Sequence, residues 1–387
     1  MEKHSLSNPQ SRYPHSAIHR VLHSRRTIFV DALLCCDRHE GTSVIKLIKL
    51  ARFLGHRLCK SFVASSRARV RFAHNDERFG LKLLVKQTTL ATTAETSGVG
   101  LHTAVPVKVR LAPAPPDTGY VFIRTDLGGF EIPANVEWVA HCSYATTLMR
   151  TGVMLSTVEH LLAALRGGGV DNAFIEVDNL EIPIMDGSAE AFTEMIERAG
   201  VVEQAVARRS LMVREKVEIV QGDRRISIEP ADSYEIDCLI DFPHPMIGVQ
   251  QFRICVTNGT FGRKIAAART FGFTEEIEAL RRANLIRGGS LDNAIVLTPD
   301  GMLNETTLRF EDEFVRHKIL DIIGDLALLG MPILGRVVAH KSGHILHAAL
   351  MTKLLRQRTA WEIVDANGNS ESRSMKTQEN ELLHSGF

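Results

Sequence analysis

The order of secondary structure predicted along residues 86–364 repeats once, and this repetition limits the fold more than any other feature of the chain. Each stretch opens with short runs of alternating apolar and polar residues, which are typical of half-buried strands. It continues into segments with apolar residues at helical spacing. A chain that forms strands first and helices afterwards, twice, favours an α+β class. We therefore predict two similar α+β domains, each with a sheet packed on helices.

Turn and cap residues bound these predicted elements. Val105–Leu111 alternates apolar and basic residues, and Ser156–Leu165 starts with a predicted Ser/Thr cap. Phe314–Leu329 is the longest helical pattern and stops at Gly330. The other predicted strands are 120–124, 174–177, 211–220, 225–229, 235–242 and 337–339, and the other predicted helices are 189–199, 275–283 and 343–355.

Composition and the repeat together predict the domain boundaries. Residues 1–85 hold 16 Lys and Arg against six Asp and Glu, although the whole chain has a formal net charge of +1. We predict a basic, poorly ordered extension at 1–85, domains at 86–207 and 208–364, and a polar tail at 365–387. The Arg- and Ser-rich extension is similar to an organellar transit peptide, but we favour a non-conserved or mis-started extension. Few aromatic residues are interspersed among its basic residues, and this argues against nucleic-acid binding.

Several protein classes are excluded by what the sequence lacks. No run of about 18 uncharged apolar residues is present, so we predict no membrane span. The six Cys form no CxxC pair and match no disulfide scaffold, which favours a reducing compartment. The motifs GxxxxGK[ST], GxGxxG and GxSxG are also absent, and this argues against phosphate-binding loops and a serine nucleophile elbow.

The predicted helix at 314–329 carries the sharpest chemical signal. His317 and Asp321 are four residues apart, so both project from one face, and Asp325 extends the same stripe by one turn. An imidazole and a carboxylate at this spacing can share one metal ion. The same pattern also fits a solvated charged face, and the residues alone leave both interpretations open.

A second signal is the pair Glu159 and His160 within a short apolar helix. Neighbouring helical residues point about 100° apart, so one could bind a metal while the other reaches a bound water. The pair could also lie on the surface. Buried ionisable groups cost several kcal/mol unless they are paired or bound to metal, so a buried pair would need a partner.

Two further segments are weaker candidates. Gly343 permits a tight turn that could aim His344 into a cleft, although His340 and His347 are rivals for that role. The Phe residues of the loop 269–273 could line an apolar slot, but buried core Phe is the more common outcome.

Six stretches in sequence order resemble one known family. The chain resembles, over about 280 residues from Val85 to Val364, the UDP-3-O-acyl-N-acetylglucosamine deacetylases of lipid A biosynthesis. Each motif alone is weak, but six in the right order and spacing are highly specific. Residues 1–85 have no counterpart in the family pattern. The six stretches are SGVGLHT (97–103), STVEHLLAAL (156–165), EIPIMDGSA (181–189), ARTFGF (268–273), LRFEDEFVRHKILDIIGDL (308–326) and KSGH (341–344).

The resemblance implies a fold and a reaction. The fold is two similar α+β domains whose helical layers face each other between two outer sheets, with the site between the domains. The reaction is zinc-dependent hydrolysis of the N-acetyl group of UDP-3-O-(3-hydroxyacyl)-N-acetylglucosamine, which gives the free amine and acetate in the committed step of lipid A biosynthesis. One Zn²⁺ per chain would be bound by His160, His317 and Asp321, with water in the fourth position.

The resemblance also implies residue roles. Glu159 would be the general base, His344 the general acid, Asp325 the partner of His344, and Thr270 a donor to the tetrahedral intermediate. The implied substrate contacts are Lys318 in the polar site, Phe242 on the uridine, Arg224 near the diphosphate, and Phe271, Phe273 and Ile277 along the acyl chain. Many members have Lys where this chain has Arg224.

The predicted partner is therefore an acylated UDP-sugar, and the predicted protein is a cytoplasmic monomer that binds no nucleic acid. One alternative is a zinc amidase acting on another N-acetylated nucleotide sugar. The other is a non-catalytic protein that binds nucleotide sugar or lipid. Retention of Glu159 and His344 argues against that second alternative, because binding alone requires no general base.

Overall fold

The computed structural model describes residues 85–365 and Ser370. The predicted extension and the predicted tail therefore lie outside the described residues, apart from Val85, Asp365 and Ser370. Within the described part, no helix combines the length and the apolar character needed to span a bilayer.

The first half of the described part is built on a five-stranded sheet. Its inner face is apolar because Val107, Val109 and Leu111 alternate with polar residues along one strand and are at most 3% exposed. Helices α3 (Glu159–Gly167) and α4 (Glu190–Ala199) lie on that face. The strands are, in spatial order, β2 (Ala94–Val99), β3 (Pro106–Pro113), β9 (Ala173–Val177), β4 (Tyr120–Arg124) and β5 (Phe130–Pro133).

Smaller elements surround this sheet. β1 (Lys86–Leu90) pairs with β10 (Val201–Ala207), and these two strands lead from the start of the described part to the second half. A three-stranded sheet is formed by β6 (Val139–His141), β7 (Thr147–Arg150) and β8 (Val153–Leu155), and the short helices are η2 (Thr125–Leu127) and η3 (Val136–Trp138).

The second half contains a seven-stranded sheet around β19 (Ile333–His340), which pairs with β11, β13 and β14. The prediction of a single strand at 211–220 is wrong. β11 (Ser210–Val213) pairs with β19 and β20, whereas β12 (Val217–Gln221) pairs only with β13. The remaining strands are β13 (Arg224–Glu229), β14 (Tyr234–Phe242), β15 (Gly248–Cys255) and β20 (Trp361–Val364).

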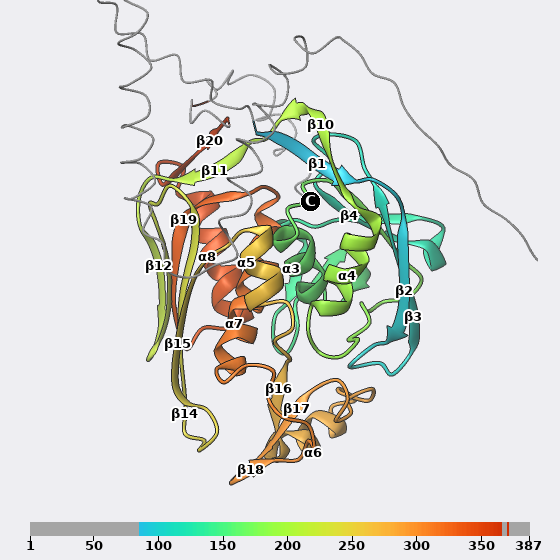
Figure 1. The fold of residues 1–387 in the computed structure, drawn as a ribbon, viewed down its shortest axis with the longest axis vertical. Helices are drawn as coiled ribbons and strands as arrows, with labels where there is room; N and C mark the ends of the chain where they lie inside the picture. The colour runs from blue at the N-terminus through green and yellow to red at the C-terminus, as the bar shows by residue number, and fades with distance from the viewer. Residues whose placement is uncertain (1–84, 366–369, 371–387) are drawn as a thin grey trace, which may run out of the picture. The chain divides into compact units, whose positions relative to one another are not determined.

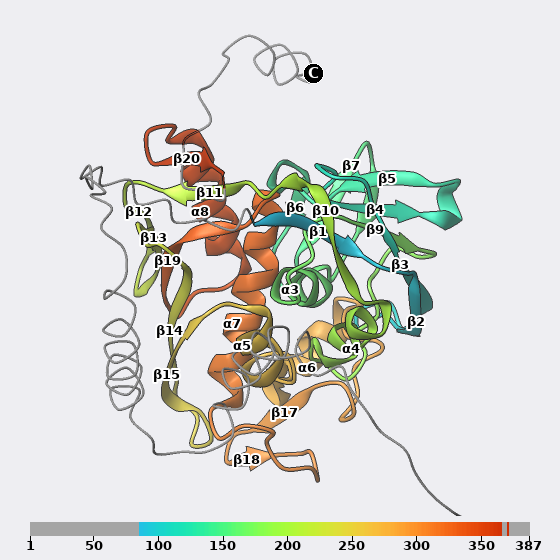
Figure 2. The ribbon, with the colours of Figure 1, turned by 45° about the horizontal axis from the view of Figure 1, so that its top comes forward.

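Three helices cover the inner face of this second sheet: α5 (Asn258–Lys264), α7 (Glu313–Leu326), which continues as η4 (Ala327–Leu329), and α8 (His344–Arg356). α7 stops as predicted, because Gly330 adopts a left-handed conformation with φ of 80°. A separate small unit comprises β16 (Phe271–Phe273), α6 (Thr274–Arg282), β17 (Ile295–Thr298) and β18 (Gly301–Met302). It lies beyond the main layers in Figure 1, whereas Figure 2 shows β17 and β18 at the lower edge of the molecule and α6 overlapping α4 and α5.

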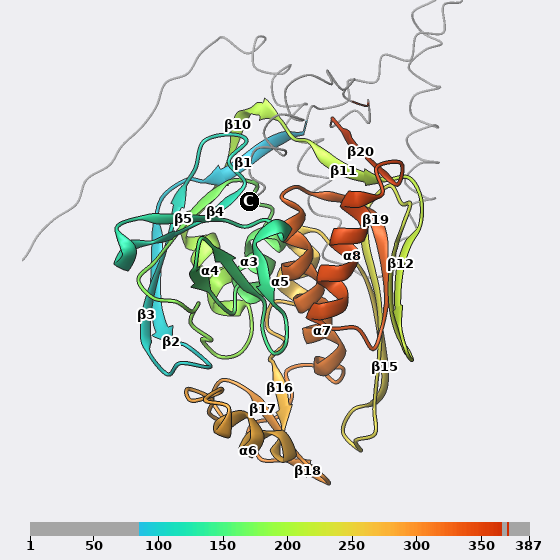
Figure 3. The same cartoon turned by 180° about the vertical axis from the view of Figure 1, so that it is seen from behind.

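The helices of both halves lie between the two large sheets, as Figures 1 and 3 show from opposite sides. One hydrophobic core runs through both halves, from Val109 and Leu162 to Ile322 and Val337. This arrangement confirms the predicted α+β class with helical layers between two sheets. The boundary between residues 207 and 208 stays a prediction, because all the described residues fall in one compact unit.

α7 crosses α3 so closely that one glycine determines the contact. A Cβ atom on Gly324 would lie 2.0 Å from the carbonyl oxygen of Glu159 and 2.7 Å from its carbonyl carbon. Both are backbone atoms of α3, so neither can move aside as a flexible side chain would. The absence of a side chain at Gly324 therefore sets the distance between the two halves.

We expect Gly324→Ala to lower the free energy of unfolding by about 1–3 kcal/mol, the usual cost of overpacking a close-packed core. An alanine in an open helical position should instead be neutral or favourable. Gly262→Ala in α5, where a Cβ meets nothing within 4 Å, is the matched control. Urea denaturation of both variants measures the difference, and equal stability of Gly324→Ala and the parent would contradict the contact.

Candidate active site

A cavity of about 280 Å³ lies between the two halves, beside the crossing of α3 and α7. It brings together side chains that are up to 245 positions apart in the chain, from Leu101 to Leu346. Most of the residues predicted from the sequence line it. These are Glu159, His160, Arg224, Thr270, Phe271, His317, Lys318, Asp321 and His344.

The first side of the cavity is held by a buried carboxylate. Glu181, only 1% exposed, accepts hydrogen bonds from the backbone N–H groups of His102 and Thr103 and from the hydroxyls of Thr103 and Thr157. These contacts join three of the motif stretches and fix the chain just before Glu159. The predicted Ser/Thr helix cap is wrong: α3 begins at Glu159, and Thr157 has φ of 58° with its hydroxyl turned to Glu181.

The second side depends on a buried ion pair. Arg269 donates from its backbone N–H and from its guanidinium to Glu313, which is fully buried at the start of α7. The carboxylate of Glu313 also accepts from the backbone N–H of Arg309. This pair joins the loop that carries Thr270 to the helix that carries His317.

Three potential metal ligands converge beside the cavity. His160, His317 and Asp321 offer ligand atoms that all lie within 4.8 Å of one another, and all three side chains are buried. The Oδ1 atom of Asp321 lies 3.4 Å from Nε2 of His317 and 3.9 Å from Nε2 of His160. The Nδ1–H of His317 donates to the carbonyl oxygen of Ala268 at 3.0 Å, which leaves Nε2 as a free acceptor.

Each of these three side chains is in the protonation state in which it can bind a metal ion. Burial lowers the pKa of His160 to about 3 and also lowers the pKa of His317, so both rings are neutral near pH 7. Burial opposes ionisation of Asp321, but the charge of the nearby Lys318 holds the pKa of Asp321 well below its usual value. Two neutral imidazoles and one carboxylate form a donor set that suits Zn²⁺. The Nδ1 atom of His160, unlike that of His317, is buried without a hydrogen-bond partner among the described residues.

Glu159 lies on the cavity wall next to this ligand set. Its Oε2 atom accepts from the backbone N–H of Thr146 at 3.1 Å. Burial raises the pKa of Glu159 to about 7, with the charge of His344 acting against this shift and that of Asp325 adding to it. A carboxylate with a pKa near neutrality can accept and release a proton at physiological pH.

Asp325 lies behind His344 and is not among the residues that line the cavity. Its Oδ2 atom accepts from Nδ1 of His344 at 2.7 Å and from Nδ1 of His347 at 2.6 Å, while Oδ1 accepts from the hydroxyl of Thr146 at 2.6 Å. Burial disfavours a charged imidazole at His344, but the charge and the hydrogen bond of Asp325 raise the pKa of His344 to about 10. His344 therefore carries its proton near pH 7. Of its predicted rivals, His347 is fully buried and bonds to the same Oδ2 atom of Asp325, and His340 lies near the carbonyl of Asp223; neither is among the residues that line the cavity.

The residues predicted to contact substrate divide into two groups. Lys318 donates to Oδ2 of Asp321 at 3.0 Å and lines the cavity together with Arg224 and Phe271. Phe242, Phe273 and Ile277 are not among the residues that line this cavity. Phe242 instead packs against Phe271 and Phe273, with ring centroids 5.7 and 5.8 Å apart, so the three rings form an aromatic cluster beside it.

Sequence reasoning missed several residues of the site. Thr146 contacts both Glu159 and Asp325, yet it lies in a segment without any periodic signal. Tyr144 and Ile345 line the cavity and are more than half exposed. Gly324 was visible only as a glycine inside a helical pattern, a signal of close packing that could have been used.

Comparison with known proteins agrees with this site. The family UDP-3-O-acyl N-acetylglycosamine deacetylase matches residues 87–356. A protein of Myxococcus xanthus (strain DK1622) named UDP-3-O-acyl-N-acetylglucosamine deacetylase is 49% identical over 281 residues, which are 72% of this chain and 90% of the relative. A protein of the same name from Solibacter usitatus (strain Ellin6076) is 46% identical over 278 residues, 72% of this chain and 94% of the relative.

The matched region includes the five-stranded sheet, both crossing helices and every residue that lines the cavity. The resemblance seen in the six motifs is thereby confirmed. The chain belongs to the UDP-3-O-acyl N-acetylglycosamine deacetylase family.

Proposed function

We propose that this protein is a zinc-dependent hydrolase that removes the N-acetyl group from UDP-3-O-(3-hydroxyacyl)-N-acetylglucosamine, the committed step of lipid A biosynthesis. One observation carries the proposal. A three-residue ligand set, a carboxylate with a raised pKa and an imidazole with a raised pKa meet at one cavity. Two titratable groups tuned in this way are typical of a general base and a general acid working together.

His160, His317 and Asp321 would hold one Zn²⁺ per chain. The donor set supports this, because two neutral imidazoles and one carboxylate are the ligands of catalytic zinc sites that keep an open position. When bound, zinc would lower the pKa of a water molecule and polarise the amide carbonyl of the substrate. Arg269 and Glu313 would keep His317 in place by fixing the start of α7.

Glu159 would take the proton of the attacking water. Its position next to His160 and its hydrogen bond from Thr146 support this role, because both fix its carboxylate beside the ligand set. The amine leaves as the C–N bond of the acetamide breaks, and it needs a proton. His344 would supply that proton, since Asp325 keeps its ring charged, and the same charge would stabilise the oxyanion together with the hydroxyl of Thr270.

The residues around the cavity support an acylated nucleotide sugar as the substrate. Arg224 and Lys318 add positive charge at the wall, where a diphosphate would be attracted. Phe271, with Phe242 and Phe273 packed against it, offers an apolar surface for uracil or for an acyl chain, and Ile277 lies nearby on α6. We assign the acyl chain to the side of Phe271, Phe273 and Ile277, and the uridine to Phe242.

We further propose that the enzyme is a cytoplasmic monomer with domains at 86–207 and 208–364. Free Cys142, Cys238 and Cys255 suit a reducing compartment. All three ligands, both proton carriers and Thr270 come from one chain, so a second copy is not needed to complete the site.

The first test is a deacetylase assay with zinc-loaded protein on acylated substrate and on unacylated UDP-N-acetylglucosamine. We expect turnover of the acylated substrate that chelation abolishes and zinc restores. Glu159→Gln should lower kcat by about 10²–10⁴-fold, the usual contribution of one general base. Equal efficiency on both substrates would favour an amidase for another N-acetyl sugar, and absence of turnover would favour a binding protein.

The second test concerns the metal. His160→Ala and His317→Ala should each reduce bound zinc well below one per chain, measured by atomic absorption after gel filtration, because each removes one of three protein ligands. His141→Ala, at an exposed imidazole outside the cavity, is the matched control and should keep its zinc. Full zinc occupancy in both ligand variants would mean that the metal is bound elsewhere.

The third test is pH dependence. Activity requires His344 in its charged form, so it should fall as pH rises through the pKa of His344, which Asp325 raises to about 10. Asp325→Asn removes that negative charge, and the alkaline limb of kcat/KM should move to lower pH. Asp223→Asn removes an exposed carboxylate that pairs with Lys341, and should leave the limb unchanged. An unshifted limb in Asp325→Asn would rule out His344 as the acid.

A further inference from the structure

A second and larger cavity, of about 1040 Å³, lies at the other end of α3. The first cavity is lined by Glu159 at the start of α3, whereas the second is lined by Arg166 near its end and by Gly168 just after it. Both halves contribute to its wall, from Thr88 in β1 to Leu334 in β19. The volume is at the upper end of the range of small-molecule sites, about 300–1,000 Å³.

Arg166 is the unusual group in this wall. Its side chain is only 9% exposed, yet none of its guanidinium N–H groups donates a hydrogen bond to another described residue. Its contacts are the ring of Tyr120, 5.3 Å away, and Oδ1 of Asp171, 4.0 Å away, which is too far for a hydrogen bond. Buried charges are costly unless they are both paired and hydrogen-bonded, so Arg166 lacks a partner of the kind it requires.

Asp171 does not fill that role in this geometry, because the hydrogen bonds that it accepts come from other donors and end on its Oδ2 atom. Its Oδ2 atom lies 2.7 Å from the guanidinium of Arg208 and also accepts from the backbone N–H and the hydroxyl of Thr88. Two buried or half-buried guanidinium groups thus share one carboxylate. The buried end of the cavity has a surplus of positive charge.

A second polar group there is also unsatisfied. The hydroxyl of Tyr234, whose side chain lines the same cavity, is buried without a hydrogen-bond partner. The charge of Arg166 acts on this hydroxyl, opposing the effect of burial, which raises the pKa of Tyr234. An acceptor at this end of the cavity would have both Arg166 and, after a small shift, Tyr234 as donors.

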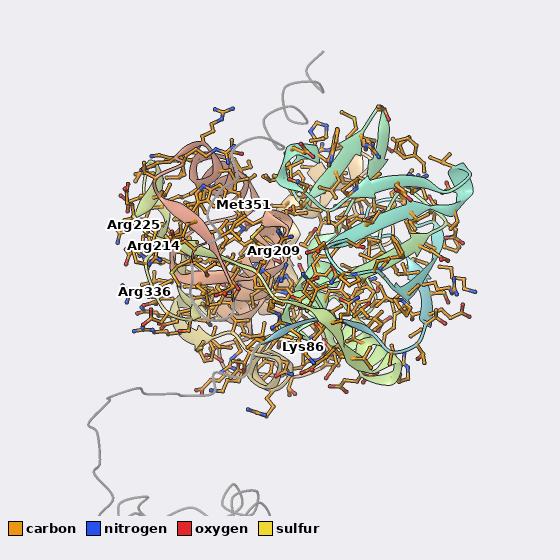
Figure 4. All side chains as sticks on the ribbon, turned by 90° about the horizontal axis from the view of Figure 1, so that it is seen from above. Lys86, Arg209, Arg214, Arg225, Arg336 and Met351 are labelled. Atoms are coloured by element: carbon orange, nitrogen blue, oxygen red, sulfur yellow. The ribbon has the colours of Figure 1, made fainter. Side chains whose placement is uncertain are left out.

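Other basic side chains near this end of the fold do have partners. Figure 4 shows the molecule from above with several of them labelled. Lys86 pairs with Glu203 at 3.3 Å, Arg209 with Asp117 at 2.8 Å, and Arg336 with Glu229 at 2.9 Å. Arg166 differs from these in being both more deeply buried and less well paired.

Most of the remaining wall is apolar, although the carboxylates of Glu197, which is exposed, and Asp365, which is half-buried, also line the cavity. Ile196 from α4, Val256 and Phe261 around the start of α5, and Ile333 and Leu334 from β19 all contribute. A ligand that fills this cavity must therefore carry a hydrogen-bond acceptor at one end, for Arg166, and an apolar body that contacts the apolar part of the wall. A planar guanidinium with free donors matches a carboxylate or a phosphate in two-pronged geometry.

We propose that this second cavity binds an amphipathic anion, with a carboxylate or phosphate headgroup on Arg166 and an apolar body along Ile196, Val256 and Phe261. The site is independent of the active-site assignment, because it shares no lining residue with the first cavity.

Calorimetric titration of the full chain tests this with four probes: dodecanoate, dodecyl phosphate, dodecanol and inorganic phosphate. Dodecanoate or dodecyl phosphate should bind at least 10-fold more tightly than dodecanol and than inorganic phosphate. The preferred headgroup distinguishes a carboxylate ligand from a phosphate ligand. Failure of both amphipathic anions to bind, or equal binding of dodecanol, would overturn the proposal.

Substitutions in the cavity wall test whether the preferred probe binds in the second cavity. Arg166→Met, which keeps the length of the side chain without its charge, should weaken binding of the preferred probe at least 10-fold, whereas Arg225→Met on the exposed surface should not. Thr193→Glu places a negative charge on the cavity wall from α4 and should also weaken binding, which keeps the test valid if Arg166→Met does not fold. Unchanged affinity in Thr193→Glu and in any folded Arg166→Met protein would show that the probe binds elsewhere, for example beside Phe271.

Discussion

The backbone contact between Gly324 and Glu159 is the constraint on which the rest of the structure depends. The candidate ligands come from two helices that belong to different halves, so their geometry is only as accurate as the crossing of α3 and α7. A missing side chain at Gly324 lets the backbones touch one residue before His160. Asp321 lies three residues before Gly324, and Asp325 lies directly after it. The close approach at Gly324 therefore fixes the positions of both the metal ligands and the carboxylate behind His344.

Burial then gives these groups their chemistry. Glu159, His160, His317, Asp321 and Asp325 are all at most 4% exposed, so each charge depends on its neighbours rather than on water. Burial alone would neutralise every one of them. It does so for the imidazoles of His160 and His317 and partly for Glu159. Asp321 stays ionised because of Lys318, and Asp325 stays ionised because of His344 and His347. Groups of one chemical type thus take different protonation states within a few ångströms.

Local patterns predicted the parts of this structure that depend on local physics. The four-residue spacing of His317 and Asp321 placed them on one helix face, and alternation found β3 and β4. Long-range contacts were not predictable in this way, since Thr146 meets Asp325 across 179 positions and no period marks it. The missed break between β11 and β12 did have a signal, because Arg214, Glu215 and Lys216 are three consecutive charged residues inside an apparent strand. The roles of Glu159 and His344 came from resemblance, and the spacing alone left rivals open.

The small unit of β16, α6, β17 and β18 has a consequence for how such an enzyme can diversify. It stands beyond the main layers in Figure 1, and α6 contains no buried residue, so the sequence of this helix is under little packing constraint. Its attachment near the ligands runs through the backbone of Thr270, which bonds to Gly187 and to Ile295. Lengthening or reshaping this appendage would therefore alter the space beside Phe271 and Phe273 while the crossing helices stayed in place. Ligand selectivity and bond cleavage are, in this architecture, separable traits.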